Sequence, residues 1–460
     1  MRRMKKNLKL QNIFKMTPAK FILWGFASVI LLGAFLLCLP ISNTAGIWMP
    51  FIDSLFTSTS SVCVTGLMVY DVAMELTIFG QVIVMLLIQI GGLGFVAITS
   101  LLFLLIGKKI DYATRLTIQE SLNQEDTKDV VKTIVFVIIA TFSLELIGFI
   151  ALIPPMIEFS GSVGLGIFKA LFLAVSAFCN AGFDPLGSAT PAFSNLLHFA
   201  TSPAVLIPVM FLIVLGGIGF IVFIDLFKKF KKKKRLNIHT RIVLWFTGIL
   251  ILLGAILVMF FEWNNPNTIG NMSTGNKIMN CFFQSITTRT AGFATFDQSQ
   301  MSQITVMICE IFMFIGGSSA SMAGGVKTTT FFVLLLLLFK SPDQNGNIIY
   351  RNRKISNNLI TKATKIVLIA VGTLVVGTTL VYTFEAGTAA LDAVIYECIS
   401  ALCTVGLSFG ITPTLCWQSK LTLSLMMYMG RIGMLTIPLA FKIKNQPNSI
   451  KYVDAKLTVG

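Results

Sequence analysis

The 460-residue chain is 55% hydrophobic, has a mean hydropathy of +0.82 and contains only 12% charged residues. A soluble protein of this length cannot bury so much apolar surface, so the composition excludes a soluble protein and indicates a membrane protein with several spans. The net charge of +16 would suggest a nucleic-acid partner only in a soluble protein, so its location along the chain matters.

Most of the positive charge lies in five segments. They hold 30 of the 36 Lys and Arg residues and cover 1–20, 107–132, 228–241, 340–365 and 442–460. The positive-inside rule places all five, and both termini, in the cytoplasm. The densest run, residues 228–235, could bind RNA, but a topology anchor that also contacts anionic lipid or a cytosolic partner fits better. We therefore expect membrane lipids as partners and no nucleic acid.

One order of elements recurs four times between the basic segments. A helix of about 20 residues leaves the cytoplasm, a helix of about a dozen residues too short to span follows, then a glycine loop, then a second spanning helix. The outgoing helices are predicted at 21–39, 133–153, 241–261 and 365–384. The short helices are predicted at 51–61, 167–177, 277–287 and 391–401, and the returning helices at 77–106, 204–227, 301–339 and 420–441.

The pattern predicts an all-α membrane protein with eight transmembrane helices, arranged as four helix–pore-loop–helix repeats around one pseudo-fourfold pore. The expected divisions are a cytoplasmic N-terminus at 1–20, pore repeats at 21–109, 133–227, 241–340 and 363–442, and a cytoplasmic C-terminus at 443–460. The third repeat is expected to contain a broken returning helix.

The four glycine loops carry the strongest functional signal. They read SVCVTGL, AFCNAGF, TTRTAGF and ALCTVGL, and their glycines, Gly66, Gly182, Gly292 and Gly406, are 116, 110 and 114 residues apart. Backbone carbonyls of four loops around one axis can replace the water shell of a cation, and glycine reaches the positive φ that this requires. The preceding pairs would supply further carbonyls: Val64 and Thr65, Asn180 and Ala181, Thr290 and Ala291, Thr404 and Val405.

Two further features support a cation filter. The short helices would direct the negative ends of their dipoles toward the cavity, with Asp53 and Asp392 near two of the opposite ends. Each loop has one glycine, in contrast to the TVGYG of potassium channels, so we expect fewer ion sites and a modest preference for potassium over sodium.

The third returning helix is too long for one crossing and is interrupted by GGSSASMAGG. Such a segment is poor helix material, and irregular backbone at membrane depth is tolerated where it lines water or protein. We interpret it as a gate below the filter, although a glycine-rich kink without a gating role would leave the same pattern. The gating residues are Gly316, Gly317, Ser318, Ser319, Ala320, Ser321, Met322, Ala323, Gly324, Gly325, Lys327 and Arg431.

Basic side chains inside a membrane are costly and usually functional. Arg431 in the fourth returning helix could repel cations, pair with the loop backbone or pair with Glu310. The returning helices also carry paired glycines. The pairs begin at Gly91, Gly216 and Gly316 in the first three helices, and the fourth helix has Gly430 and Gly433 on either side of Arg431 and Ile432. These glycines are explained by close helix packing, and small residues there would also keep a pore wide.

Acidic residues follow three of the filter glycines. Asp71 and Asp297 come five residues after theirs and Asp184 two after, whereas Ile411 takes the fifth position in repeat four. They predict an electronegative outer mouth that concentrates cations, unless acids are merely tolerated there.

Enzymatic and metal-site signals are missing. The eight cysteines form no CxxC pair, and His198 and His239 are far apart, so we expect free thiols and no catalytic or zinc site. The GGVKT segment at 324–328 lacks the spacing of a phosphate-binding loop. We expect no enzyme activity and no cofactor in this chain.

These motifs together resemble the TrkH/KtrB/HKT superfamily of cation transporters over about residues 20–442. The RTAGF sequence at 289–293 and the absence of extra N-terminal helices resemble its KtrB-type potassium-uptake subunits most. The resemblance implies that the four glycines are filter residues, that the interrupted segment is the gating loop and that Arg431 faces it. It also implies a homodimer with one pore per subunit in the bacterial plasma membrane, on a cytosolic octameric KtrA-type ring that binds ATP and ADP, with sodium as a possible activator. It does not distinguish KtrB from KtrD.

Two other functions are open. A secondary, sodium-coupled solute transporter would bind its solute at a broken helix at mid-membrane, but four parallel repeats suit one radial pore better. A membrane-embedded enzyme would need a catalytic constellation that Glu145 and Glu310 alone do not make.

Overall fold

The structure is almost entirely helical. It is a computed structural model that describes residues 17–94, 97, 130–187, 192–233, 235–341, 343 and 347–436. The predicted C-terminal segment 443–460, most of the N-terminal segment 1–20 and nearly all of the first returning helix beyond Gly94 lie outside these residues.

Four long helices correspond to the predicted outgoing helices. They are α2 (Pro18–Cys38), α8 (Val130–Ser160), α12 (Ile238–Glu262) and α16 (Asn357–Phe384), with mean hydropathies of 2.1 to 2.8 over their spans. Each is long and apolar enough to cross a membrane. The prediction ended the second helix at residue 153 before Pro154 and Pro155, which was wrong. Close packing on the next helix holds the extension in place, because a Cβ on Gly166 would lie 2.6 Å from the Ile157 Cα.

A shorter helix follows each long one and leads into a glycine loop. These are α3 (Phe51–Cys63), α9 (Val163–Cys179), α13 (Thr274–Thr287) and α17 (Leu391–Cys403). The prediction placed two of the four starts correctly, at Phe51 and Leu391. It ended α3, α9 and α17 two residues early and made α9 too short. Short segments between the main helices are η1 (Pro40–Ser42), α4 (Val72–Glu75), η2 (Leu197–Phe199), η3 (Gln298–Gln300) and η4 (Thr412–Thr414).

Each returning segment has a helix that ends near its glycine pair. For the third segment this break was predicted, whereas the other three helices end earlier than predicted. The four helices are α5 (Ile78–Leu93), α10 (Pro203–Ile218), α14 (Gln303–Phe314) and α18 (Trp417–Ile432). Left-handed glycines follow three of them: Gly94, Gly219 and Gly433 have φ of 84°, 98° and 100°. Glycine alone adopts this conformation readily, so these three helices stop there.

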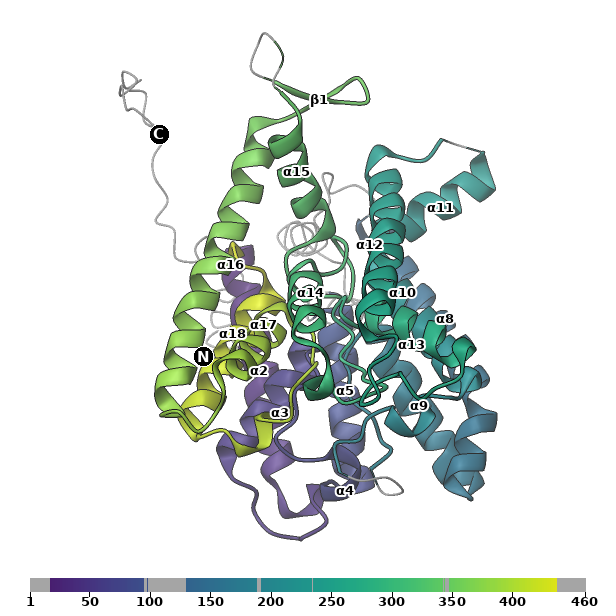
Figure 1. The fold of residues 1–460 in the computed structure, drawn as a ribbon, viewed down its shortest axis with the longest axis vertical. Coiled ribbons are helices and arrows are strands. Elements are labelled where there is room, and N and C mark those ends of the chain that lie inside the picture. The colour runs from purple at the N-terminus through teal and green to yellow at the C-terminus, as the bar shows by residue number, and fades with distance from the viewer. Residues whose placement is uncertain are drawn as a thin grey trace, which may run out of the picture.

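The prediction of one continuous helix at 204–227 was wrong. At Gly219 the chain turns by 93° from α10 into α11 (Phe220–Lys232), an amphipathic helix that ends in the basic run. The third returning segment is interrupted, as its composition predicts: α14 is followed by non-helical residues and then by α15 (Thr328–Phe339). In Figure 1, α15 and α16 run side by side to the antiparallel hairpin β1 (Ile348–Tyr350) and β2 (Arg353–Ile355).

The short helices form the centre of the packing. Phe56, Phe172, Phe178 and Phe283 on these helices are fully buried, whereas the long helices expose apolar side chains such as Trp24 and Phe260. Exposed apolar side chains on the outer helices are expected for a protein whose outer helices face lipid. All eight cysteines are free thiols in the structure.

Candidate ion filter and gating loop

The four loop glycines form a closed ring. A Cβ added to any of them would collide with a carbonyl oxygen of the next repeat, that of the residue just before the next repeat's glycine. The distance would be 2.5 to 2.9 Å for the glycines of repeats one, two and three, and shorter for that of repeat four. The pairs, in chain order, are Gly66 with Ala181, Gly182 with Ala291, Gly292 with Val405 and Gly406 with Thr65. Because the last pair returns to the first repeat, the loops surround one axis with carbonyl oxygens close to it.

The residue two before each glycine also has a left-handed backbone. Val64, Asn180, Thr290 and Thr404 have φ between 52° and 66°. In α3, α9 and α17 this residue is the helix C-cap. Non-glycine residues adopt this conformation at an energetic cost, so its recurrence indicates a geometry that the packing imposes. Two left-handed positions per loop turn the chain sharply at the end of each short helix.

Serine side chains hold two of the four loop glycines, a feature that our reading of the sequence missed. The Ser60 hydroxyl accepts the Gly66 N–H at 3.0 Å, and the Ser400 hydroxyl accepts the Gly406 N–H at 2.9 Å. Aligning the repeats would have shown this signal, because a serine stands six residues before three of the four glycines. Repeat three has Ile286 there, and the Thr287 hydroxyl donates instead to the Phe293 carbonyl at 2.6 Å.

Three threonine hydroxyls in these loops are buried without a hydrogen-bond partner among the described residues: Thr65, Thr290 and Thr404. Leaving a buried hydroxyl unpaired costs free energy, whereas a cation coordinated by oxygen would satisfy it. The donor set around the ring is therefore backbone carbonyl and hydroxyl oxygen, which suits a hard monovalent cation.

The loop of residues 316–325 lies against this ring. A Cβ on Gly324 would collide with the Thr404 hydroxyl and would lie 3.0 Å from the Cys403 carbonyl oxygen. Its two ends meet in a parallel bridge between Ile315 and Val326, with the Gly316 N–H donating to Val326 at 3.0 Å. The loop is thus a closed excursion from α14 that contacts repeat four at Cys403 and Thr404, close to Gly406.

Arg431 connects the loop to the first repeat. Its guanidinium donates to the Met322 carbonyl in the loop and to the carbonyls of Gly91 (2.5 Å) and Gly92 (3.1 Å) at the end of α5. Of the three roles considered for Arg431, these hydrogen bonds support pairing with the backbone of the loop. Among the described residues, Arg431 forms no ion pair with Glu310. A half-buried arginine with three carbonyl acceptors is stabilised by charge-assisted hydrogen bonds.

Repeat two holds the other side of the loop, another feature that the sequence reading missed. Ser318 and Met322 donate their N–H groups to Gly217 (3.0 Å) and Gly216 (3.1 Å), and Phe220 donates to Ala320 (2.8 Å). Lys327 closes the loop from within, through Nζ bonds to the carbonyls of Ala323 (2.5 Å) and Gly324 (3.4 Å).

The paired glycines in the returning helices have a packing role. A Cβ on Gly91, Gly216 or Gly430 would collide with a carbonyl of the adjacent short helix, at Val62, Phe178 and Leu402 respectively. In the third repeat the corresponding Gly316 meets the Gly324 carbonyl of its own loop. Close helix packing, one of the two interpretations considered, therefore accounts for the first glycine of three pairs.

The outer acids are engaged in local structure. Asp71 is buried and accepts the N–H groups of Ala73 (2.8 Å), Met74 (3.1 Å) and, from repeat two, Phe193 (2.9 Å). Asp184 is buried and accepts the Leu186 N–H at 3.0 Å. Burial, reinforced by the Asp71 carboxylate, raises the pKa of Asp184 to about 7. The two acids thus also stabilise loops, and Asp297, which is exposed, caps η3.

Repeat four supplies a buried acid from a different position. Glu397 on α17 accepts hydrogen bonds from Ser408, two residues after Gly406, and from Thr412 at 3.0 Å. Ser408 occupies the place that Asp184 has after Gly182. A second buried carboxyl, Glu145 on α8, accepts hydrogen bonds from Gln89 at 3.3 Å and from the Cys179 thiol at the end of α9. Neither was predicted, because each is brought to its loop by tertiary packing.

Helices of this length and hydropathy around a ring of loops define a multi-pass membrane protein. The chain matches the family model described as "TrkH: Cation transport protein" over residues 14–452 and belongs to that family. It is a transport protein and not an enzyme.

Curated relatives cover nearly its full length. The chain is 35% identical to the Ktr system potassium uptake protein B of Bacillus subtilis (strain 168), over 97% of each chain. It is 34% identical to the potassium/sodium uptake protein NtpJ of Enterococcus hirae, over 97% of this chain and 98% of the relative. It is 33% identical to the Ktr system potassium uptake protein B of Vibrio alginolyticus, over 96% and 94%.

A solved structure shares the fold. The crystal structure of the potassium transporter TrkH from Vibrio parahaemolyticus matches with a TM-score of 0.70 at 16% identity, covering 92% of this chain and 84% of that one.

Proposed function

We propose that the protein mediates channel-like potassium uptake through the ring of Gly66, Gly182, Gly292 and Gly406. The observation that carries the proposal is the closure of that ring, in which the carbonyl before each glycine faces the glycine of the preceding repeat. The names of the relatives from Bacillus subtilis and Vibrio alginolyticus support potassium as the ion. Carbonyl oxygens bind a dehydrated cation without burying a net charge.

The proposed topology has eight transmembrane segments in four pore repeats, with both termini in the cytoplasm of a bacterial plasma membrane. The positions of the basic segments support this orientation. Four long apolar helices would supply the outgoing spans, and the shorter returning segments, some of them broken, would supply the rest. The repeat boundaries 21–109, 133–227, 241–340 and 363–442 belong to the same proposal.

We assign ion selection to the four loop glycines and the two residues before each of them, twelve residues in all. We attribute the modest selectivity to the presence of only one glycine in each loop. The C-terminal ends of α3, α9 and α17 lead directly into the loops, so their dipoles favour a cation at the ring. The outer acids Asp71, Asp184 and Asp297 would raise the local cation concentration in addition to their capping bonds.

Gating is assigned to the loop of residues 316–325 with Lys327 and Arg431. The contact of Gly324 with Thr404 supports a loop seated beside the filter, and the bonds from Arg431 support a closed position. Opening requires these bonds to break or the loop to move as a unit. Breaking three charge-assisted hydrogen bonds costs free energy, and a regulatory partner can offset that cost with its own contacts to the open state.

The partner proposed from the relatives is a cytosolic Ktr ring that binds ATP and ADP, and the proposed assembly is a homodimer. The designation "Ktr system" in two relatives supports a multi-component system. The basic inner segments, including α11, would face such a ring or the lipid headgroups. Sodium as an activator belongs to the same family-based proposal.

A second candidate is transport of sodium together with potassium. The 34% identity to a potassium/sodium uptake protein favours it, and the single glycine per loop is compatible with weak discrimination. A sodium-coupled solute transporter receives less support, since a closed ring of four loops suits an ion path along one axis better than a solute site at one broken helix.

Uptake by a potassium-auxotrophic bacterium tests the proposal. Cells expressing the chain with a Ktr-type ring partner should grow at low potassium and take up rubidium. The variant Gly292→Ser, expressed at the same level, should change the preference for potassium over sodium. Absence of rescue under every sodium condition would refute potassium uptake, and an unchanged preference in Gly292→Ser would remove Gly292 from the filter.

A further inference from the structure

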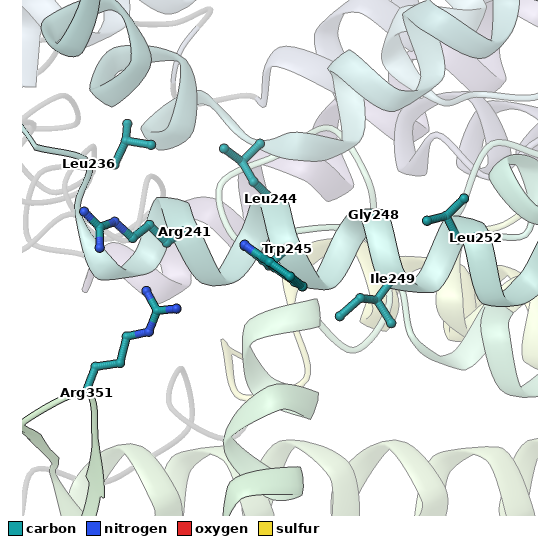
Figure 2. A pocket seen from close by; sticks show the side chains of 8 residues that line it. All are labelled: Leu236, Arg241, Leu244, Trp245, Gly248, Ile249, Leu252 and Arg351. Carbon is teal, nitrogen blue, oxygen red and sulfur yellow. The ribbon is translucent and has the colours of Figure 1, made fainter.

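A groove runs along the outer face of α12, at the end that joins the basic segment 228–241. Its volume is about 660 Å³, within the range of small-molecule pockets of about 300–1,000 Å³. Figure 2 shows its lining, which comes from α12 and the residue Leu236 before it, and from Arg351 in the turn of the β1–β2 hairpin. Arg241, Trp245, Gly248 and Leu252 mark its length along the helix.

The wall of the groove is apolar and open to the outside. The side chains of Trp245, Ile249 and Leu252 are 71%, 45% and 54% exposed. Gly248 lies between them, and a Cβ added there would meet nothing within 4 Å, so the missing side chain leaves a gap in the row. From Arg241 to Leu252 the helix rises about 17 Å, close to the half-thickness of a bilayer core at about 15 Å.

The cytoplasmic end of the groove is strongly positive. Arg241 lies in the first turn of α12, where the helix dipole is also positive, and Figure 2 shows its guanidinium near that of Arg351. Arg351 and Asn352 have φ of 45° and 61°, and this tight turn holds Arg351 at the hairpin tip. Among the described residues, neither guanidinium lies within ion-pair distance of a carboxylate.

We propose that the groove binds an anionic phospholipid of the inner leaflet. Its phosphate would bridge the two guanidinium groups, which match phosphate geometry by bidentate hydrogen bonds. One acyl chain would lie along Trp245, Gly248 and Leu252 on a helix that is itself long and apolar enough to span the membrane. Charge complementarity at one end and a leaflet-length apolar wall together select a lipid over a soluble anion.

Lipid binding to the purified full-length chain tests this inference without measuring transport. Delipidated protein in an uncharged detergent is titrated with phosphatidylglycerol or phosphatidylcholine, and bound lipid is counted by native mass spectrometry. The double variant Arg241→Gln/Arg351→Gln should bind phosphatidylglycerol about 30-fold more weakly, because each basic residue contributes about 1 kcal/mol. Gly248→Leu should also weaken binding while the protein keeps its thermal stability, since the added side chain enters open space.

The matched control is Arg235→Gln/Arg353→Gln. It removes the same charge from the same two segments at exposed residues outside the groove, and its binding should stay near that of the unchanged chain. Equal weakening in both double variants would overturn the proposal in favour of general surface attraction. So would competition by soluble glycerol phosphate as strong as that by the lipid, or a change of oligomeric mass in Gly248→Leu, which would make the groove a contact with a second copy.

Discussion

At the scale of single residues, each of the four loop glycines lacks room for a side chain. In repeat four the added Cβ collides with the Thr65 carbonyl oxygen most closely of all. We expect Gly406→Ala to shift that carbonyl, at a cost of about 1–3 kcal/mol, and to lower potassium uptake by about tenfold or more. Rubidium uptake normalised to the amount of membrane-inserted protein measures the effect.

Gly372→Ala on α16 is the control for Gly406→Ala, because its added Cβ meets nothing within 4 Å. Uptake by this variant should match that of the unchanged chain. Normal uptake by Gly406→Ala would contradict the assignment of the ring to ion passage.

The raised pKa of Asp184, about 7, predicts a pH dependence of stability. An acid whose folded pKa lies above its unfolded value of 3.8 stabilises the fold when protonated, and this contribution is lost as the pH rises through the folded pKa. Asp184→Asn mimics the protonated form, so the variant should gain melting temperature relative to the unchanged chain between pH 5 and pH 8. Asp71 and Lys169 are the charged groups that influence this carboxyl.

Thermal unfolding at both pH values in one detergent measures the difference. Asp297→Asn serves as the control for the loss of a carboxylate, since Asp297 is exposed. A pH-independent difference between Asp184→Asn and the unchanged chain would show that Asp184 does not titrate in this range.

At the scale of elements, the loop of residues 316–325 is held by repeats one, two and four at once. Deleting Ser319, Ala320 and Ser321 removes the acceptor of the Phe220 N–H and shortens the excursion. If the loop obstructs the path, ion flux should rise several-fold, most clearly without a ring partner. Flux into proteoliposomes measures it, and unchanged flux in a folded deletion variant would remove the gate from the proposal.

Arg431→Gln tests the same element by a smaller change. It removes the charge that binds the Met322, Gly91 and Gly92 carbonyls, so we expect higher flux in the absence of the partner. Arg353→Gln, at an exposed position in the hairpin, controls for the lost charge and should leave flux unaltered. Lower flux in a stable Arg431→Gln protein would mean that Arg431 supports the open path instead.

Hydropathy and glycine content predicted most elements, and tertiary contacts explain the failures. The apolar run continues through Gly219, so periodicity indicated one helix at 204–227. The break occurs because Gly219 adopts φ of 98° and the Phe220 N–H bonds to Ala320, a residue of another repeat. Three of the short helices, α3, α9 and α17, end two residues later than predicted for a related reason. Left-handed caps such as Val64 and Thr404 are held by the packed ring, which no local propensity reveals.

At the scale of the whole molecule, the proposed topology can be tested by thiol labelling. Cys38 and Cys416, the two native thiols that are not fully buried, are first replaced by serine. In that background, Ala45→Cys should react with a membrane-impermeant maleimide added to intact cells. Arg353→Cys should react only after permeabilisation. Both positions are exposed, so equal reactivity from outside would contradict the assigned orientation.

Hydropathy, charge and glycine spacing are local properties of the chain. They were therefore sufficient to predict the class of protein, the recurrence of four similar units and the positions of their glycines. The sequence also indicated that residues 316–325 are not helical. Three features become visible only in the folded chain: the glycines close a ring, Arg431 binds the end of α5 and the loop, and Glu397 accepts a hydrogen bond from Ser408. These contacts depend on how the backbones of different repeats pack together, and residues as far apart as Gly91 and Arg431 become neighbours only once the helices have assembled.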